Sequence, residues 1–326
     1  MNFPRFFRSE SIRGNKRKNY NTLRCIILRC GSIPRSFGSL RNDIMKVICT
    51  EKSQVLATHI ARALKTTVVS VSYSRFPDGE HYLVTGETDD EMVIVGSVVD
   101  NDSLVQLMLL ADACDRSTNH LVLPYMAYAR QDKRFRPGEP VSSRVIARAL
   151  SMGVSDVTTV NIHDSEVLKS FTVPAQNLSL AAGIGSYIRT LGLKNPLILA
   201  PDEGAMHFAQ NVASAGGWEC DHLEKTRLSG VEVKMAPRQL SAKSRSVVIV
   251  DDIISTGSTI ATAAGMLCQQ GANDVCAACV HGVFTGGAYA RLMATGLRDV
   301  VCSDTIERSC SRISAAEEIA RAIRNR

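Results

Sequence analysis

The stretch VVIVDDIISTGST, residues 247–259, decides the fold of this chain. Its leading apolar residues predict a buried strand that ends at two carboxylates, Asp251 and Asp252. A short loop follows, and we expect a helix to begin at about Thr259. Ligands bind at the carboxyl ends of the strands in an open α/β sheet. The stretch therefore predicts both a fold class and the place of a site.

Small polar residues fill the loop after this strand. They are Ser255, Thr256, Gly257, Ser258 and Thr259. Backbone N–H groups at a helix start suit a phosphate, hydroxyls add donors, and glycine permits close approach. The two carboxylates would repel a phosphate but suit sugar hydroxyls or a metal ion. Together these features describe a sugar-phosphate site; the simpler alternative is a capped helix beside two solvated acids.

Apolar, β-rich runs alternate with helical patterns along the rest of the chain. This is typical of mainly parallel sheets covered on both faces, so we expect an α/β protein. The predicted strands are 46–50, 68–73, 92–98, 120–125, 157–162, 196–200, 246–251, 275–280 and 299–302. The predicted helices are 55–64, 103–115, 143–152, 181–191, 205–215, 259–270, 288–294 and 315–323.

The body of the chain reads as two similar domains. A faint repeat matches Gly153, Asp156, Val157 and His163 to Gly271, Asp274, Val275 and His281 at one constant spacing. We therefore predict a duplicated domain, with one copy over 45–179 and the other over 180–326. Each copy has an ordinary domain size.

Residues 1–44 differ from the body. Residues 1–45 hold ten Lys or Arg but only two acids, Glu10 and Asp43, whereas the remainder has 28 basic and 30 acidic residues. The net charge of +6 therefore gives no reason to expect nucleic-acid binding by the body. Three interpretations stay open for this basic extension: a translation start misassigned upstream of Met45, a targeting segment, or a genuine tail. We therefore expect residues 1–44 to be either disordered or not translated.

The ten cysteines form no dense, regular framework, and no secretory signal precedes them. We therefore expect a reducing, cytoplasmic location. Cys276 and Cys279 form a CxxC inside an apolar, strand-like run, where we expect buried thiols rather than a redox or metal site. The long uncharged stretches contain too many polar residues to predict a membrane span.

Further motifs contain charged or titratable side chains in turns, in a loop and at the ends of predicted strands. FPDGEHY at 76–82 reads as a turn, and RQDKRFRPGEP at 130–140 as a cationic excursion able to close over a polyphosphate. His163 and Asp202 each follow a predicted strand. In EKTRLSG at 224–230, Lys225 and Arg227 alternate and so share one face of a strand-like run.

These motifs, in this order, resemble the ribose-phosphate pyrophosphokinase family over residues 45–326. Segment 247–259 is similar to the phosphoribosyl-pyrophosphate loop of that family and of type I phosphoribosyltransferases, but simple phosphoribosyltransferases lack the combination at 125–149. The resemblance implies two tandem type I phosphoribosyltransferase-like domains. It also implies transfer of pyrophosphate from ATP to the anomeric hydroxyl of D-ribose 5-phosphate, giving 5-phosphoribosyl 1-pyrophosphate and AMP for nucleotide biosynthesis.

The resemblance also implies roles for individual residues. ATP is expected at Phe76, Asp78, Gly79, Glu80, Arg130, Gln131 and Asp132. Ribose 5-phosphate is expected at Arg227, Asp251, Asp252, Ser255, Thr256, Gly257, Ser258 and Thr259. Catalysis is expected from Lys225 and Arg227, and contacts to the magnesium cofactor from His163 and Asp202. The ATP site is expected to be shared between subunits of a homo-oligomer, with no nucleic-acid or membrane partner.

Two positions depart from the common family loop. Ser255 replaces a carboxylate, a variant associated with archaeal-type members, and Ser258 replaces a glycine. A β-carbon at Ser258 would crowd the phosphate or demand a different backbone angle. Two alternative functions therefore stay open beside the kinase: a catalytically silent regulatory paralogue and a phosphoribosyltransferase.

Overall fold

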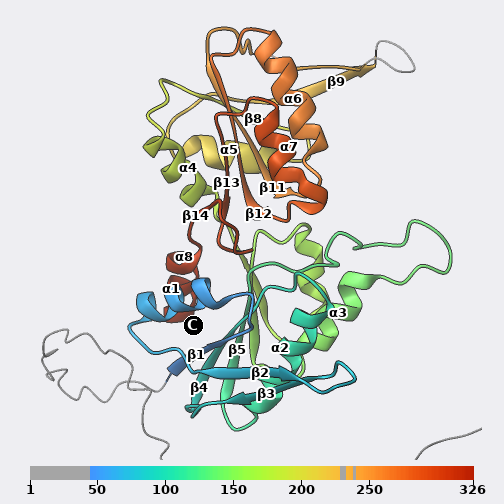
Figure 1. The fold of residues 1–326 in the computed structure, drawn as a ribbon, viewed down its shortest axis with the longest axis vertical. Coiled ribbons are helices and arrows are strands. Elements are labelled where there is room, and N and C mark those ends of the chain that lie inside the picture. The colour runs from blue at the N-terminus through green and yellow to red at the C-terminus, as the bar shows by residue number, and fades with distance from the viewer. Residues whose placement is uncertain (1–44, 228–232, 238–239) are drawn as a thin grey trace, which may run out of the picture. The chain divides into compact units, whose positions relative to one another are not determined.

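The computed structural model describes residues 45–227, 233–237 and 240–326 (Figure 1). Residues from Asn42 to Arg326 form one compact unit. The predictions for the basic extension 1–44 lie outside the described residues. In the described part, no helix is both long and apolar enough to cross a membrane.

Parallel strands form the first sheet, in the spatial order β1-β4-β5-β6-β7. They are β1 Met45–Cys49, β4 Glu91–Val95, β5 Thr118–Leu123, β6 Asp156–Val160 and β7 Ala175–Leu178. The helical connections are α1 Gln54–Leu64, α2 Asn101–Ala113, α3 Ser142–Leu150 and the 3-10 turn η1 Ser165–Ser170. The antiparallel hairpin of β2 Val71–Arg75 and β3 His81–Thr85 forms a small sheet of its own.

The second sheet has the order β10-β9-β8-β11-β12-β13-β14, and β9 with β10 is its antiparallel pair. Its strands are β8 Leu197–Ala200, β9 Cys220–Arg227, β10 Val233–Pro237, β11 Ser246–Ile254, β12 Asp274–Gly282, β13 Asp299–Ser303 and β14 Ser311–Ile313. Its helical elements are α4 Ala181–Thr190, α5 Met206–Ser214, α6 Ser258–Gln269, η2 Thr285–Gly287, α7 Ala288–Ala294 and α8 Ala316–Arg324. The α/β prediction of two mainly parallel sheets flanked by helices is confirmed.

The structure of strand β11 shows why residues 247–250 are all apolar. Val248 and Val250 pack into one hydrophobic cluster, and Val247 and Ile249 pack into another. Successive side chains of a strand point to opposite faces, so both faces of the sheet are covered. The strand also continues past its predicted end at Asp251 to Ile254, because pairing with β12 persists there.

The duplication is real at the level of topology, but the predicted residue repeat is wrong. The order β1-β4-β5-β6-β7 corresponds to β8-β11-β12-β13-β14, with the β2–β3 hairpin in the place of β9 and β10. This arrangement makes β5 equivalent to β12 and β6 equivalent to β13. The spacing of Gly153 and Gly271 instead aligned β6 with β12, because both strands follow a helix that ends at a positive-φ glycine.

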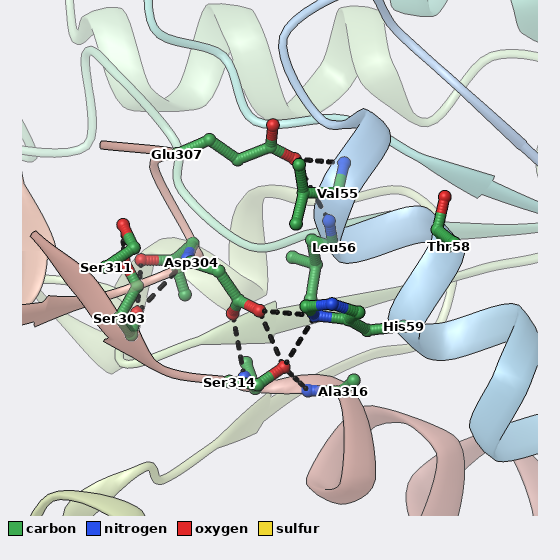
Figure 2. A network of polar contacts seen from close by, with 12 residues as sticks. Val55, Leu56, Thr58, His59, Ser303, Asp304, Glu307, Ser311, Ser314 and Ala316 are labelled. Atoms are coloured by element: carbon green, nitrogen blue, oxygen red, sulfur yellow. Dashed lines mark hydrogen bonds and ion pairs between the residues drawn. The ribbon is translucent and has the colours of Figure 1, made fainter. Parts of the chain in front are cut away.

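The C-terminal helix α8 packs beside α1, at the opposite end of the sequence (Figure 1). The segment between β13 and α8 binds the first turns of both helices (Figure 2). Asp304 accepts the Ala315 N–H at 2.8 Å, and Ser314 accepts the Ala316 N–H at 3.3 Å. The other oxygen of the Asp304 carboxylate accepts the Ser314 hydroxyl at 2.6 Å and lies 3.3 Å from His59 Nδ1.

Helix α1 is capped by a residue far away in sequence. The N-cap residue Ser53 makes no side-chain capping bond, but Glu307 Oε1 accepts the Val55 N–H at 2.7 Å and the Leu56 N–H at 3.0 Å. A carboxylate in this position satisfies unpaired donors and complements the helix dipole. Sequence patterns around α1 gave no signal for this cap.

We predict that Glu307→Ala lowers the free energy of unfolding by about 1–2 kcal/mol, as removal of an N-cap does. Glu307→Gln keeps an acceptor oxygen and should lose less than half as much. Urea unfolding of both variants measures the difference. Equal losses of unfolding free energy in the two variants would show that the hydrogen bonds from α1 to Glu307 contribute nothing to stability.

Candidate active site

Residues just beyond the carboxyl ends of strands from both sheets contact one another. Ser97, after β4, donates its hydroxyl to the carbonyl oxygen of Thr305, after β13. The Tyr125 ring, after β5, lies 5.0 Å from the His281 ring in β12. His281 Nε2 lies 3.2 Å from the carbonyl oxygen of Asn161, after β6. The carboxyl ends of the two sheets therefore face the same space.

Hydrogen-bond chemistry fixes the tautomer of the buried His281. A carbonyl oxygen only accepts, so Nε2 carries the proton and donates it to Asn161. Nδ1 then accepts from the Thr305 hydroxyl at 2.9 Å. Burial lowers the pKa of His281 to about 4, so the ring is neutral at physiological pH.

A cavity of about 640 Å³ lies at this junction. Six residues singled out in the sequence line it: Arg130, His163, Asp202, Asp251, Asp252 and Ser255. A second hollow of about 440 Å³ shares Arg130 and His163 with it and adds Asp132 and Lys133. The sequence motifs 130–140 and 247–259, which are far apart in the chain, thus border one connected region.

The two acids after the apolar run of β11 differ in charge. Burial, together with the charge of Asp252, raises the pKa of Asp251 to about 8. Burial would also raise the pKa of Asp252, but hydrogen bonds with His163 and Asp251 hold it below its usual value. Asp251 is therefore largely protonated at neutral pH, and Asp252 is ionised.

Asp252 binds a residue of the other sheet. His163 Nδ1 lies 3.0 Å from the Asp252 carboxylate, and this hydrogen bond raises the pKa of His163 against the effect of burial. A neutral acid, a carboxylate and an imidazole ring thus lie side by side. Such a set can both donate to and accept from the hydroxyls of a polyol.

The loop after β11 leads into α6 in the way the sequence predicted. Gly257 is the N-cap with φ +68° and supplies no side chain to the first-turn N–H groups, which lack intrahelical partners. Arg291 Nη2 donates to the Thr256 carbonyl at 2.9 Å, and the Thr285 N–H donates to the Ser255 carbonyl at 3.1 Å. These bonds occupy the carbonyl oxygens of Thr256 and Ser255. The N–H groups at the N-terminus of α6 are therefore suited to an anion.

Ser258 is the first residue of α6. Its φ is not positive, so its β-carbon imposes no backbone strain. Its hydroxyl lies 3.1 Å from the Thr256 hydroxyl and is exposed. The expectation that a serine there demands a different backbone angle is wrong.

Comparison with known proteins identifies the family. The family model of the N-terminal domain of ribose phosphate pyrophosphokinase matches residues 45–153, and that of the phosphoribosyl transferase domain matches residues 175–303. The chain belongs to the ribose-phosphate pyrophosphokinase family. The predicted resemblance is therefore confirmed.

Relatives of this family align with nearly the whole body of the chain. The Ribose-phosphate pyrophosphokinase of Methanosarcina mazei is 47% identical, over 86% of this chain and 95% of its own. That of Methanopyrus kandleri is 41% identical, over 86% and 99%. The crystal structure of phosphoribosylpyrophosphate synthetase from Mycobacterium smegmatis has a TM-score of 0.74 and 26% identity, and the match covers 86% of this chain and 97% of that one. The predicted likeness to archaeal members agrees with the identities to the Methanosarcina and Methanopyrus proteins.

Other residues expected to bind ATP lie apart from the cavity lining. Phe76–Glu80 forms the tip of the β2–β3 hairpin, where the Phe76 N–H donates to the Glu80 carbonyl at 2.9 Å and Gly79 has φ +98°. Phe76 is half exposed and stacks edge-on against Tyr82. Gln131 instead closes the base of the 130–142 excursion, by donating to the Pro140 carbonyl at 3.2 Å and accepting from the Ser142 hydroxyl.

Lys225 and Arg227 lie near the end of β9, which pairs with β8 and β10. Their side chains are outside the described part of the structure. Their expected catalytic roles therefore stay predictions.

Sequence reasoning missed part of the cavity wall. The polar residues that it did not single out are Asn161, Ser165, Asn177, Ser179, His207 and Asn211. Asn177 and Ser179 lie at the end of β7, a strand too short and polar to be predicted. His207 and Asn211 are four residues apart on one face of α5, a spacing that would have found them once α5 was assigned to the site.

We predict that the polar contacts of His281, one across the junction and one to Thr305 in its own half, stabilise the fold cooperatively. His281→Phe keeps the ring but leaves the Asn161 carbonyl without this donor, and Thr305→Val removes the donor to Nδ1. Each should lower the free energy of unfolding by about 1–3 kcal/mol. The double variant should lose less than the sum by about 1 kcal/mol, because the two side chains share a hydrogen bond. If the losses of the two single variants add up to the loss of the double variant to within about 0.3 kcal/mol, this coupling is contradicted.

Proposed function

We propose that this chain is a ribose-phosphate diphosphokinase. It would transfer the β,γ-pyrophosphoryl group of ATP to the anomeric hydroxyl of D-ribose 5-phosphate and release AMP. The observation that carries the proposal is that Asp251, Asp252 and Ser255 line one cavity, and that the loop from Ser255 leads into the uncapped N-terminus of α6, in a chain of this family. Curated relatives bear the name of that activity.

Ribose 5-phosphate would bind along the loop after β11. The N–H groups and hydroxyls of residues 255–259 would hold the 5-phosphate, with Arg227 as a further contact. Asp251 and Asp252 would hold the ribose hydroxyls, since one is protonated and the other ionised. In this arrangement the ionised carboxylate of Asp252 contacts the sugar rather than the phosphate.

ATP would lie on the Arg130 side of the cavity. Arg130, Gln131 and Asp132 would bind it from the 130–142 excursion. Phe76, Asp78, Gly79 and Glu80 would serve a neighbouring subunit, because their hairpin tip is not part of this cavity lining. A homo-oligomer with shared ATP sites follows, and we propose a cytoplasmic location for it, in keeping with the unpaired thiols of the described chain.

The described residues fit a magnesium ion that arrives with the nucleotide. No cluster of three or more candidate ligands occurs in the described part of the chain, so a fully protein-bound ion does not fit. Asp202 and His163 both line the cavity, and Asp202 is exposed. Magnesium commonly takes one or two carboxylates plus phosphate oxygens and water. When bound, the ion would offset negative charge on the phosphates.

The reaction needs little covalent chemistry from the protein. The anomeric oxygen forms a bond to the β-phosphorus of ATP, the bond from that phosphorus to the α,β-bridging oxygen breaks, and AMP leaves with the bridging oxygen. Asp252 is the ionised carboxylate suited to accept a hydrogen bond from the sugar. Lys225, Arg227 and Arg130 would neutralise charge on the transferred group, so positioning and electrostatics supply most of the rate.

Product analysis tests the reaction. The full chain is incubated with ATP and magnesium, with and without ribose 5-phosphate, and nucleotides are separated by chromatography. AMP that forms only with the sugar is the expected result. ADP would show ordinary phosphoryl transfer, and absence of product from folded protein would favour the silent paralogue; both contradict the proposal.

We predict that Lys225→Ala lowers kcat by about 10³-fold, the scale for removing one charge-stabilising group. Binding of ribose 5-phosphate, measured by calorimetry, should be largely kept. Near-normal turnover in this variant would remove Lys225 from the mechanism.

We predict that Gly257→Ala raises the KM for ribose 5-phosphate about tenfold, which corresponds to about 1.4 kcal/mol. A side chain at φ +68° is strained, and its Cβ would lie 3.0 Å from Leu292 Cδ1. Gly265→Ala is the matched control: it lies inside the same helix with open space around it, and its KM should not change. Equal KM values in the two variants would contradict phosphate binding at this loop.

A further inference from the structure

Two buried thiols of the second sheet lie next to each other. Cys302 is in β13 and Cys310 immediately precedes β14, and their sulfur atoms are 3.6 Å apart. The Cys302 N–H also donates to the Cys310 carbonyl at 3.2 Å. The pair is distinct from the CxxC of the sequence, because Cys276 and Cys279 lie on β12.

The surroundings make the two thiols unequal. The hydrogen bond between the two sulfur atoms, together with the charges of Arg308 and Arg312, lowers the pKa of Cys310 despite burial. The same bond and burial raise the pKa of Cys302. Cys310 therefore has the more thiolate character, and it follows directly after the exposed residues Arg308 and Ser309.

The pair also lies behind the loop that we propose for the sugar phosphate. A β-carbon on Gly282 would lie 2.7 Å from Cys302 Sγ, so this sulfur packs directly against the end of β12. Arg308 donates to the Gly282 carbonyl at 3.0 Å and to the Val283 carbonyl at 3.0 Å. The next residue, Phe284, donates its N–H to the Ile254 carbonyl at 3.1 Å, beside Ser255.

We propose that Cys302 and Cys310 are a peroxide-sensitive thiol pair whose disulfide weakens the binding of ribose 5-phosphate. The thiolate of Cys310 attacks one oxygen of hydrogen peroxide, which gives a sulfenic acid and hydroxide. The Cys302 sulfur then attacks that sulfenic sulfur, and water leaves. In balance, two thiols and one peroxide give one disulfide and two waters, with both sulfurs oxidised and the peroxide reduced.

The geometry explains how forming this disulfide would change the structure of the binding loop. A disulfide requires a sulfur–sulfur distance of about 2.05 Å, so the atoms must approach by roughly 1.5 Å from their present separation. Cys302 is packed against Gly282, and Arg308 is bonded to Gly282 and Val283. Movement of either strand is therefore transmitted to residues 282–285, which support Ile254 and Ser255.

Peptide mapping tests the covalent step by itself. The full-length chain is treated with hydrogen peroxide, remaining thiols are alkylated, and the protein is digested with trypsin without reduction. Cleavage after Arg298, Arg308 and Arg312 places the two cysteines on separate peptides, DVVCSDTIER and SCSR. We expect these peptides linked, two hydrogens lighter than their sum, in wild type and in Cys268→Ser, which lacks an exposed thiol, but not in Cys310→Ser. Unlinked, alkylated peptides after oxidation would overturn the proposal.

The effect on binding rests on the proposed function and is measured separately. Oxidised wild type should show a KM for ribose 5-phosphate raised about fivefold or more, reversed by dithiothreitol, whereas Cys310→Ser should not respond. A linked pair with unchanged KM would overturn the regulatory effect. If the reduced enzyme forms no AMP, the proposed function fails, and the mapping experiment still decides whether the thiol pair reacts.

Discussion

The hydrogen bond from His281 Nε2 to the carbonyl oxygen of Asn161 joins the carboxyl ends of two parallel sheets. Around it, Ser97 donates to Thr305 and Tyr125 lies against the imidazole ring. Because the His281 ring and the Ser97 hydroxyl are buried, leaving either without its partner across the junction would cost stability. The cavity exists where it does because residues at both sets of strand ends are held together in this way.

This junction also determines the charges in the cavity. It places His163 from one sheet beside Asp252 from the other, and that contact keeps Asp252 ionised while Asp251 retains its proton. The pair of carboxylates and the contact from the other half act together, because hydrogen bonds with both His163 and Asp251 lower the pKa of Asp252. The domain duplication therefore has a chemical consequence: one copy supplies Asp251, Asp252 and Ser255 to the cavity, and the other supplies Arg130 and His163.

Much of this arrangement was predictable from the sequence, and the failures have physical causes. The apolar run before Asp251 fixed a parallel, doubly covered sheet, and the residues of 255–259 fixed the helix start, because both signals are local. The strands β7, β9, β10 and β14 are short, edge or polar, so periodicity did not find them. The repeat aligned the wrong strands because a glycine after a helix recurs at many such turns.

Contacts between distant segments were the part that sequence could not supply. Glu307 capping α1, His281 binding Asn161, and Cys302 lying beside Cys310 each depend on tertiary geometry with no spacing rule behind it. The sequence identified half of the polar residues that line the cavity, but not the contacts that hold them there. Those supporting contacts join the two halves together with the hydrogen bond between His163 and Asp252.

The most direct test of this account is a crystal structure of the chain with ribose 5-phosphate and a non-hydrolysable ATP analogue bound together. The account predicts both ligands in the one cavity between the sheets. The 5-phosphate should lie on the amides of 255–259, the sugar hydroxyls beside Asp251 and Asp252, and the triphosphate beside Arg130 and His163. A sugar phosphate bound away from the 255–259 loop, or a nucleotide outside this cavity, would contradict the central claim.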